Sequence, residues 1–275
     1  MPASVKSIIE KTTIAAPGAF NAASALLIEK AGFDCVYISG AGLSNSSGVP
    51  DAGVLSLEEV LNLSSYIIKA VKIPAIVDVD TGFGGPAEVK KTAEAFERLG
   101  AGAIQIEDQE FPKRCGHLPG KTVIPAEEFI QKIKTATGAR KSKDFLIIAR
   151  TDARAVEGLD GAIRRANMYI EAGADIIFPE ALESKDEFAR FAREVEAPLM
   201  ANMTEFGKTP YMTLYDFRNM GYSIVLFPMT CFRIAMKSME DALVELNRNG
   251  TQKGLLERMQ SRQEFYELIR YFDYR

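Results

Sequence analysis

Short apolar runs alternate with longer amphipathic stretches along most of this 275-residue chain. The apolar runs are rich in Val and Ile and show little polar alternation, as expected for parallel strands that are buried on both faces. Eight runs predict strands, at residues 12–16, 35–39, 75–80, 103–107, 145–150, 175–179, 199–202 and 223–227. The stretches between them predict helices, at residues 20–31, 57–71, 87–99, 126–135, 159–172, 185–195 and 215–220.

Glycine marks the boundary between several of these helices and the strand that follows. Gly32, Gly100 and Gly173 each stand at such a junction, where glycine adopts the left-handed conformation that ends many helices. Eight repeated strand–helix units predict a (β/α)8 barrel, also called a TIM barrel, and an open doubly wound sheet is the alternative. Composition does not change along the chain, so we expect residues 1–275 to form a single barrel domain.

Two more helices are predicted after the last strand. Residues 230–249 carry apolar side chains at helical spacing, a glycine-containing turn follows, and residues 255–271 form a second amphipathic segment. The aromatic residues of the C-terminal helical extension, residues 251–275, are Phe265, Tyr266, Tyr271, Phe272 and Tyr274. They favour contact with another subunit over a cap on the bottom of the same barrel.

Composition narrows the class of protein before any motif is considered. The net charge of −4 and the pI of about 5.4 argue against a nucleic-acid-binding surface. No apolar run approaches the ~20 residues needed to cross a membrane, so no membrane span is expected. Three widely separated cysteines do not form a disulfide framework, and the first residues lack a signal-peptide core. We therefore expect a cytoplasmic protein in a reducing environment.

Charged and polar residues follow the carboxyl ends of six consecutive predicted strands, which meet at one mouth of a barrel. Asp78 and Asp80 are two residues apart on one strand, so both are expected on the same side, beside Glu107 of the next strand. With a single histidine in the chain, any metal must be bound by oxygen ligands, which suit Mg²⁺ or Mn²⁺. These three carboxylates are therefore predicted to hold the metal.

Two other strand ends carry groups that bind anions. Arg150 ends the fifth predicted strand and can bind a substrate carboxylate through two parallel hydrogen bonds. The segment Ser39-Gly40-Ala41 follows the second strand and offers a hydroxyl and closely approaching backbone amides. The barrel mouth is therefore predicted to take a metal ion together with an anionic ligand.

The sequence Lys113-Arg114-Cys115-Gly116-His117 contains the only histidine of the chain and one of its three cysteines. It lies in a long irregular stretch, residues 109–123, and loops of that length are often lids or binding loops. Its cationic residues are expected to favour the thiolate of Cys115, because positive charge stabilises an anion, although the resting state stays open. A catalytic lid is one interpretation, and a basic surface loop with an incidental cysteine is the other.

Taken together, these motifs resemble the isocitrate lyase and phosphoenolpyruvate mutase superfamily, in particular its methylisocitrate lyase branch. The similarity extends from about Thr12 to Tyr271, and the Lys-Arg-Cys-Gly-His motif is its most specific part. Other motifs that carry it are Tyr37-Ile38-Ser39-Gly40, Asp78-Val79-Asp80-Thr81-Gly82-Phe83-Gly84, Ile106-Glu107-Asp108-Gln109, Ala149-Arg150-Thr151-Asp152-Ala153, Phe178-Pro179-Glu180-Ala181, Asn202-Met203-Thr204-Glu205-Phe206 and Gly250-Thr251-Gln252-Lys253. The resemblance implies magnesium-dependent, retro-aldol (Claisen-type) cleavage of 2-methylisocitrate to pyruvate and succinate, as in the methylcitrate cycle of propionate catabolism.

The resemblance also implies roles for individual residues. Asp80 and Asp78 would hold Mg²⁺ directly or through water, with Glu107 in the outer shell, and Mn²⁺ is the alternative ion. Cys115 would protonate the carbanion-like succinate intermediate. The residues that would set the pKa of its thiol and bind anionic product are Lys113, Arg114 and His117. Tyr37 is the candidate for the base that deprotonates the substrate hydroxyl.

The same resemblance divides the substrate between two sets of residues. The carboxylate of the pyruvate-forming half would be bound by Ser39, Gly40, Ala41 and Arg150. The succinate half would be held by Gly116, Asn202, Thr204 and Arg233, with Glu180 and Arg262 also lining the site. The extra methyl group would fit an apolar pocket of Phe178, Leu226 and Pro228, although ordinary core packing at the barrel mouth would also explain these residues.

Related activities and an assembly follow from the resemblance as well. The alternatives are dimethylmalate lyase, isocitrate lyase or another superfamily carbon–carbon lyase acting on a small 2-hydroxy or 2-oxo acid such as oxaloacetate. A non-catalytic barrel that serves as an interaction scaffold is a further interpretation, and the complete set of charged motifs argues against it. The expected partners are a small polycarboxylate substrate and, in a homotetramer, other copies of the chain. The C-terminal helices of relatives swap between subunits, and the short tail ending at Arg275 leaves the extent of that swap open.

Overall fold

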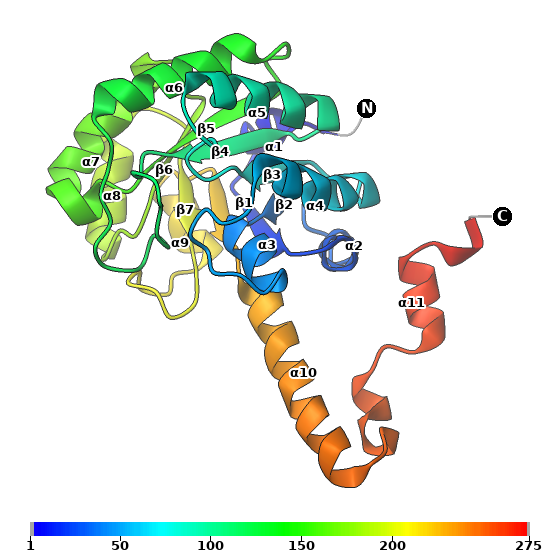
Figure 1. Cartoon of the computed structure of the whole chain (residues 1–275). Helices are drawn as coiled ribbons and strands as arrows, with labels where there is room; N and C mark the ends of the chain where they lie inside the picture. The colour runs from blue at the N-terminus through cyan, green and yellow to red at the C-terminus, as the bar shows by residue number, and fades with distance from the viewer. Residues whose placement is uncertain (1–2, 274–275) are drawn as a thin grey trace.

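The computed structural model describes residues 3–273 and shows a closed barrel of parallel strands surrounded by helices (Figure 1). Within that part of the chain, eight strands pair in the order β6-β5-β4-β3-β2-β1-β8-β7. The barrel closes between the two outer strands, where Ile177 is bridged to Leu199 and its amide donates to the carbonyl of Pro198 at 3.0 Å. The strands are β1 (Ile14–Ala19), β2 (Val36–Ile38), β3 (Ala75–Asp78), β4 (Ala103–Glu107), β5 (Leu146–Thr151), β6 (Ile176–Pro179), β7 (Met200–Asn202) and β8 (Ile224–Phe227). The prediction of a (β/α)8 barrel is confirmed.

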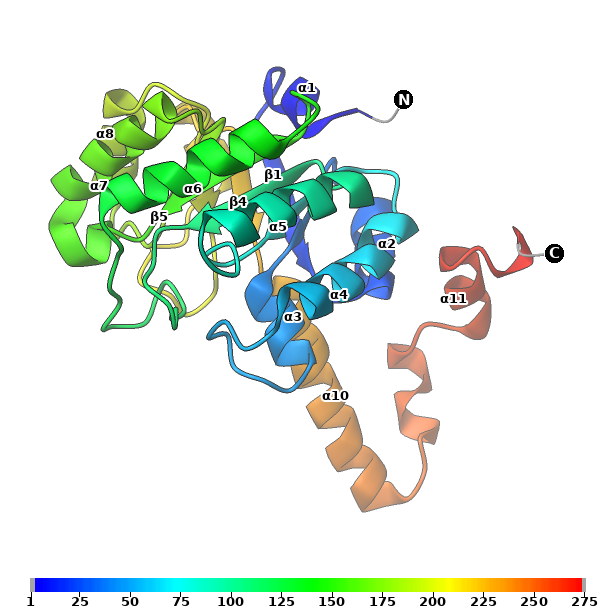
Figure 2. The ribbon, with the colours of Figure 1, turned by 45° about the horizontal axis from the view of Figure 1, so that its top comes forward.

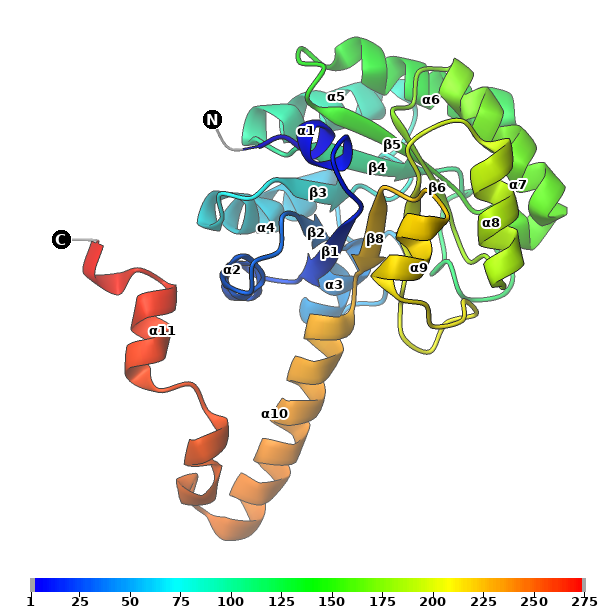
Figure 3. The same ribbon diagram turned by 180° about the vertical axis from the view of Figure 1, so that it is seen from behind.

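Helices cover the outside of the barrel, as the amphipathic stretches predict (Figure 2). The helices of residues 3–273 are α1 (Val5–Ile9), α2 (Ala22–Lys30), α3 (Gly40–Ser46), α4 (Leu57–Ala70), α5 (Pro86–Leu99), α6 (Ala126–Ala139), α7 (Arg154–Glu171), α8 (Lys185–Glu194), α9 (Leu214–Asn219), α10 (Thr230–Asn249) and α11 (Arg262–Leu268), with short 3₁₀ helices η1 (Lys253–Arg258) and η2 (Tyr271–Asp273). The last four of these, α10, η1, α11 and η2, do not cover the barrel (Figure 3). The sequence did not indicate α1 or α3, because both are short and α3 consists largely of Gly, Ser and Asn, which are poor helix formers. Among residues 3–273, no helix combines the length and the apolar character needed to cross a membrane.

Two layers of buried side chains hold the barrel together. The larger layer lies between the strands and the helices and includes Phe129 and Phe188. The smaller layer fills the interior of the barrel and includes Tyr37 and Phe178. Strands buried on both faces need apolar residues at every position, which explains their continuous apolar runs. Inward-facing residues at the carboxyl ends of the strands therefore lead directly into the barrel mouth.

The C-terminal arm, residues 230–273, extends away from the barrel (Figure 3). None of the residues of α10 is buried, and the arm then returns toward α2, where Arg270 Nη2 lies 3.5 Å from Glu29 Oε2. The predicted continuous helix over residues 255–271 is wrong, because the chain extends at Met259 and restarts as α11 behind the N-cap Ser261. The rings of Tyr266, Tyr271 and Phe272 pack on one another, and Tyr274 lies outside the described residues.

Candidate active site

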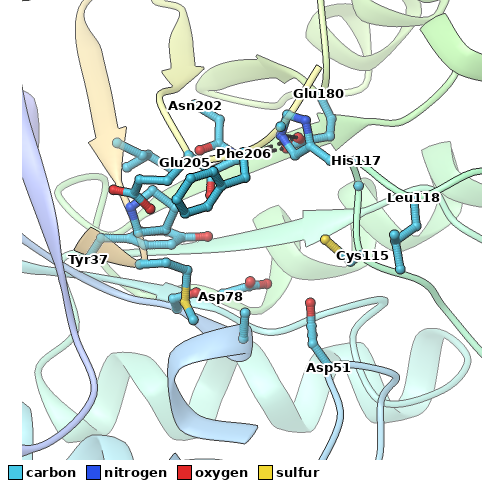
Figure 4. A pocket seen from close by; sticks show the side chains of 18 of the residues that line it. Tyr37, Asp51, Asp78, Cys115, His117, Leu118, Glu180, Asn202, Glu205 and Phe206 are labelled. Carbon is cyan, nitrogen blue, oxygen red and sulfur yellow. Dashed lines mark hydrogen bonds and ion pairs between the residues drawn. The ribbon is translucent and has the colours of Figure 1, made fainter. Parts of the chain in front are cut away.

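A cavity of about 280 Å³ opens at the carboxyl ends of the strands, where the sequence predicted the site (Figure 4). The cavity is enclosed by three parts: the wall, formed by side chains at the strand ends, the lid at residues 109–123, and the first turn of α10. The predicted residues that line it are Tyr37, Ser39, Ala41, Asp78, Cys115, Gly116, His117, Arg150, Phe178, Glu180, Asn202, Thr204, Leu226, Pro228 and Arg233. The fold thus brings most of the predicted site residues to one cavity.

The predicted residues that do not line this cavity are Gly40, Asp80, Glu107, Lys113, Arg114 and Arg262. Two of them lie well outside it. Arg114 is exposed, and its backbone is held by the Gln109 side chain, which donates to the Arg114 carbonyl at 2.9 Å and accepts from its amide at 3.0 Å. Arg262 is exposed on α11 in the C-terminal arm. Within one chain, neither side chain takes the place in the site that the sequence predicted.

Asp78 and Asp80 lie together, but for a different reason from the one predicted. Strand β3 ends at Asp78, and Asp80 stands in a turn with a φ of 48°, so the two do not share a face of one strand. Instead the turn folds back, and the amide of Asp80 donates to Asp78 Oδ1 at 3.1 Å. A Cβ at Gly40 would lie 3.1 Å from an oxygen of each carboxylate, so both face the same point. Burial and the charge of Asp80 raise the pKa of Asp78 to about 6, although Lys113 and Arg150 act in the opposite direction.

Glu107 is fully buried, and neither of its carboxylate oxygens has a hydrogen-bond partner. Burial raises its pKa well above the ordinary value, although Arg150 Nη1 lies 3.4 Å away. No group of three or more Asp, Glu, His or Cys side chains within residues 3–273 is arranged to hold a metal ion, so the predicted three-carboxylate cluster is not formed. Mg²⁺, however, needs only one or two carboxylates and keeps several waters. The paired aspartates and the unpartnered oxygens of Glu107 therefore fit a hydrated divalent cation.

Arg150 is the cation at the centre of the wall. Its Nε donates to Asp152 Oδ2 at 2.9 Å and its Nη2 to Asp152 Oδ1 at 3.1 Å, so the two-pronged hydrogen bond predicted for a substrate is made with the protein. Its Nη1 lies 3.4 Å from Glu107 and 3.6 Å from Glu180. Burial alone would lower the pKa of Arg150, but Asp152, Glu107 and Glu180 hold it well above the ordinary value. Arg150 therefore stays charged. Its Nη1 is the guanidinium nitrogen that is not hydrogen-bonded to Asp152.

Tyr37 does not have the environment of a base. Its hydroxyl donates to Gln105 Oε1 at 2.7 Å, and burial raises the pKa of the phenol well above its ordinary value. Asp51, by contrast, is a carboxylate in the cavity wall that the sequence analysis did not single out. It follows Gly48-Val49-Pro50, whose Gly and Pro mark a turn after the second strand, and that was the only signal for it.

Cys115 is half-buried, and in Figure 4 its sulfur lies between the side chains of His117 and Asp51. Burial raises the pKa of its thiol above the ordinary value of 9.0, and the charge of Asp51 adds to that shift. The prediction that neighbouring cations favour the thiolate is therefore wrong. The main physical reason is burial of the thiol. In addition, the ammonium of Lys113 is bound by two carboxylates, Asp51 and Asp80, which offset its charge.

His117 is likewise bound to the wall. Its Nε2 lies 2.8 Å from Glu180 Oε1, and its Nδ1 accepts a hydrogen bond from the amide of Lys208 at 3.1 Å. This pattern places the imidazole proton on Nε2. Burial alone would raise the pKa of Glu180, but Arg150 and His117 hold it well below its ordinary value. Glu180 is therefore an ionised anchor for the lid.

The start of α10, with the predicted Arg233, and the turn after β7 close one side of the cavity, and the sequence gave no role to Thr230, Glu205 or Phe206. The hydroxyl of Thr230 bonds Glu205, and Arg233 Nε lies 3.5 Å from the same carboxylate. The guanidinium of Arg233 also lies over the ring of Phe206, 5.4 Å from its centre. Glu205 and Phe206 follow the predicted Asn202 and Thr204 directly, so their place in a strand-end motif was the available signal.

Comparison with known proteins identifies relatives over nearly the whole chain. A family model described as phosphoenolpyruvate phosphomutase matches residues 5–247. A 2-methylisocitrate lyase of Aeropyrum pernix is 54% identical over 271 residues, which cover 98% of this chain and 87% of that protein. The 2-methylisocitrate lyases of Bacillus subtilis and Escherichia coli are 46% and 42% identical, each over 94% of this chain and over 85% and 88% of their own lengths.

Solved structures share the fold of this chain. A 2,3-dimethylmalate lyase has a TM-score of 0.93 at 31% identity, and the match covers 99% of this chain and 93% of that one. A phosphonopyruvate hydrolase in complex with oxalate and Mg²⁺ has a TM-score of 0.87 at 33% identity, covering 96% of this chain and 92% of that one. With the family model matched over residues 5–247, the chain belongs to the phosphoenolpyruvate phosphomutase family.

Proposed function

We propose that the chain is a carbon–carbon lyase that cleaves 2-methylisocitrate into pyruvate and succinate. The observation that carries this proposal is the 54% identity, over 98% of the chain, to a protein named 2-methylisocitrate lyase. The cavity supports it, because Arg150 and Cys115 line its wall together with carboxylates. Cleavage next to a carboxylate leaves an unstable anionic fragment, which needs nearby positive charge and a proton donor.

The cleavage breaks the bond between the hydroxyl-bearing carbon of the substrate and its neighbour. The hydroxyl proton leaves to a base, the O–H electron pair forms the carbonyl of pyruvate, and the electrons of the broken bond stay on the succinate carbon. That carbon takes the proton of the Cys115 thiol. Before the next turnover the base releases its proton to solvent and the thiolate takes one proton from solvent, so the protons balance. The raised pKa of Cys115 keeps the thiol in the form that can donate.

Asp51 is our candidate for the base that takes the hydroxyl proton. Its carboxylate lines the cavity, whereas the hydroxyl of Tyr37 is a donor to Gln105 and keeps its proton. Asp51 itself pairs with Lys113. Of the other carboxylates that line the cavity, Glu180 is bound by both His117 and the amide of Asn202, and Glu205 by both Thr230 and Arg233. We therefore assign Tyr37 to the wall rather than to proton transfer.

We further propose that Asp78 and Asp80 hold Mg²⁺, with Mn²⁺ as the alternative ion and Glu107 behind them. The convergence of the two aspartates on one point and the unpartnered oxygens of Glu107 support this assignment. A bound ion would acidify the substrate hydroxyl and stabilise the carbonyl that cleavage creates. The phosphonopyruvate hydrolase of similar fold, which binds Mg²⁺ and oxalate, is consistent with such a site in this family.

Dimethylmalate cleavage is the second candidate, because a 2,3-dimethylmalate lyase has a TM-score of 0.93 to this chain. Both substrates carry a methyl group, and Phe178, Leu226 and Pro228 supply an apolar part of the cavity wall for it. A methyl group in an apolar pocket is worth only about 1–3 kcal/mol, so turnover of a second substrate at a lower rate is expected.

The test supplies the purified protein with Mg²⁺ and, in separate reactions, with 2-methylisocitrate, isocitrate, dimethylmalate or oxaloacetate. The expected result is release of pyruvate and succinate in equal amounts from 2-methylisocitrate, at the highest kcat/KM of the four substrates. A higher kcat/KM for dimethylmalate would select the second candidate. Turnover of none of them would overturn every enzymatic assignment and favour a scaffold.

We propose that the C-terminal helices of a second copy cover the outside of the barrel between β8 and β1. A cavity of about 480 Å³ there is lined almost entirely by apolar residues, among them Pro17, Leu27 and Phe227. The arm that would be exchanged is apolar and uncovered, since Leu243 and Val244 are 63% and 64% exposed in one chain. Burial of both surfaces would favour association, and the homotetramer expected from the sequence is our proposal.

The assembly is tested by light scattering during size-exclusion chromatography. We expect the mass of four 30.2 kDa chains for the wild type and a smaller species for Leu243→Glu, which places a charge on the apolar face of α10. A wild-type mass of one chain would contradict the exchange.

A further inference from the structure

Lys121 carries a buried ammonium group at the end of the lid and takes no part in the proposed cleavage. Its side chain is only 1% exposed. Its Nζ donates to the carbonyl of Gly116 at 2.5 Å and to Asp152 Oδ1 at 2.7 Å. Lys121 therefore joins the residue next to Cys115 to strand β5 and the turn that follows it.

The carboxylate that receives Lys121 is the one that holds Arg150. Asp152 is fully buried, and its Oδ1 accepts from both Lys121 Nζ and Arg150 Nη2. Its amide donates to Asp108 Oδ1 at 2.8 Å, which fixes the carboxylate to the neighbouring strand end. One anchor thus sets the position of Arg150 in the wall and of the Gly116 carbonyl in the lid.

The backbone of the lid packs tightly against the wall at Gly116. A Cβ at Gly116 would lie 2.5 Å from Arg150 Nη2 and 2.5 Å from Glu180 Cγ, so the backbone of the lid is in close contact with both side chains. The remaining lid anchors, Lys113 and His117, reach the loop carrying Asp51, the turn at Asp80, and Glu180. Of these three lid anchors, Lys121 alone is bound to Asp152, the carboxylate that accepts two hydrogen bonds from Arg150.

We propose that Lys121 is a positioning residue that fixes the lid relative to Arg150 and so places the Cys115 thiol against the substrate carbon. This inference rests on the proposed lyase function for its catalytic consequence, but its structural part does not. A reacting group displaced by about 1 Å costs about 10²-fold in rate. A merely structural Lys121 would balance the charge of Asp152 without affecting the position of the lid.

The two roles are separated by the rate at which iodoacetamide alkylates Cys115, measured by peptide mass spectrometry. A short unstructured peptide with one cysteine, added to every reaction, is the reference. We expect Lys121→Met to raise the ratio of Cys115 alkylation to peptide alkylation by about tenfold or more, because a displaced lid exposes the thiol. Lys121→Arg keeps a buried cation and is expected to stay close to the wild type. Lys134→Met, at an exposed lysine of α6, is the matched control and should leave the ratio unchanged.

For activity on 2-methylisocitrate, we expect Lys121→Met to lower kcat by about 10²-fold while KM changes by less than about threefold. An alkylation ratio within twofold of the wild type in folded Lys121→Met would overturn the proposal. Because alkylation needs no turnover, this result stands even if the protein cleaves none of the substrates, so the two proposals fail separately.

If Lys121→Met does not fold, Lys121→Ala provides the same test by chemical rescue. The expected result is fast alkylation of Cys115 in this variant, slowed again by propylammonium ion, which can fill the space of the missing side chain. Tetramethylammonium at the same concentration is the control for ionic strength. Slow alkylation of Cys115 in Lys121→Ala without any additive would overturn the proposal.

Discussion

The strand ends and the lid both bring charged side chains to the cavity, but they place them in different ways. At the strand ends, Glu107 and Arg150 are direct partners in the pairing of β4 with β5, so the register of the sheet decides where each group lies. In the lid, Lys113 and His117 take their positions from Asp51, Asp80 and Glu180 on other elements. The wall is therefore positioned by the backbone of the barrel, whereas the lid is positioned by ion pairs and hydrogen bonds.

This difference predicts two kinds of response to substitution. A change in the wall should act mainly on the free energy of unfolding, because the wall is part of the buried core. A change in the lid should act mainly on turnover, because the lid holds its groups by a few polar contacts above a stable barrel. Substitutions in the lid and behind the wall can therefore test the difference separately.

The largest effect is expected from Cys115→Ser in the lid. A serine hydroxyl has a similar size but is a far weaker acid, so kcat should fall by about 10³-fold, within the range that general acid catalysis contributes. The thermal unfolding midpoint and the affinity for Mg²⁺, measured by calorimetry, should stay at their wild-type values. Turnover similar to that of the wild type would remove the thiol from the mechanism.

The second-largest effect is expected at Gly116, where the lid contacts the wall. Gly116→Ala would place a Cβ 2.5 Å from Arg150 Nη2, so the lid must lift and kcat/KM should fall by about 10²-fold. The matched control is Gly138→Ala in α6, where a Cβ meets nothing within 4 Å. That variant should keep full activity and gain about 0.5–1 kcal/mol of stability, because alanine is the better helix former. Equal activities of the two variants, measured by pyruvate release, would show that the lid does not need this contact.

The wall was largely predictable from the sequence, because the carboxyl ends of buried strands follow from where their apolar runs end. Arg150 and Glu180 were placed at the barrel mouth from their positions at strand ends alone. Asp80 was assigned correctly to the neighbourhood of Asp78, but for the wrong reason, since a turn with positive φ brings it there. Strand periodicity does not determine a turn of that kind.

The lid and the arm were predictable only in part, because tertiary partners decide their details. Neighbouring cations suggested a lowered pKa for Cys115, but burial raises it, and the sequence does not reveal that Asp51 neutralises Lys113. The amphipathic pattern over residues 255–271 hid the break before Ser261, although Ser261-Arg262-Gln263-Glu264 is a capping-box sequence that marks a helix start. Resemblance to a family supplied the roles, and the structure supplied the partners that test them.

A third, smaller effect is the alkaline limit of turnover. A general acid must carry its proton, so activity is fully present below the pKa of the Cys115 thiol and is lost as the pH rises through it. Burial raises that pKa above the ordinary 9.0, so kcat should be constant between about pH 7.5 and 9 and fall about tenfold per unit only at higher pH. A limit below about pH 8 in the pH profile of kcat would mean that the lid does not shield the thiol as the structure shows.

The smallest effect on turnover is expected from a change behind the wall, Tyr169→Phe. The hydroxyl of Tyr169 donates to Asp108 Oδ2 at 2.8 Å and accepts from Arg165 Nη1 at 3.1 Å, and both contacts are buried. Its loss should lower the free energy of unfolding by about 1–2 kcal/mol in urea denaturation, while kcat stays within about threefold of the wild type. Tyr66→Phe, at a tyrosine that is 65% exposed, is the control and should change neither quantity.

If Tyr169→Phe instead lowered kcat strongly at unchanged stability, the wall would respond as the lid does. Asp108 also binds the amide of Asp152, which holds both Arg150 and Lys121, so such a result would mean that the barrel transmits small shifts to the site. The comparison between a wall set by register and a lid set by contacts would then fail at Asp152, where the two regions meet.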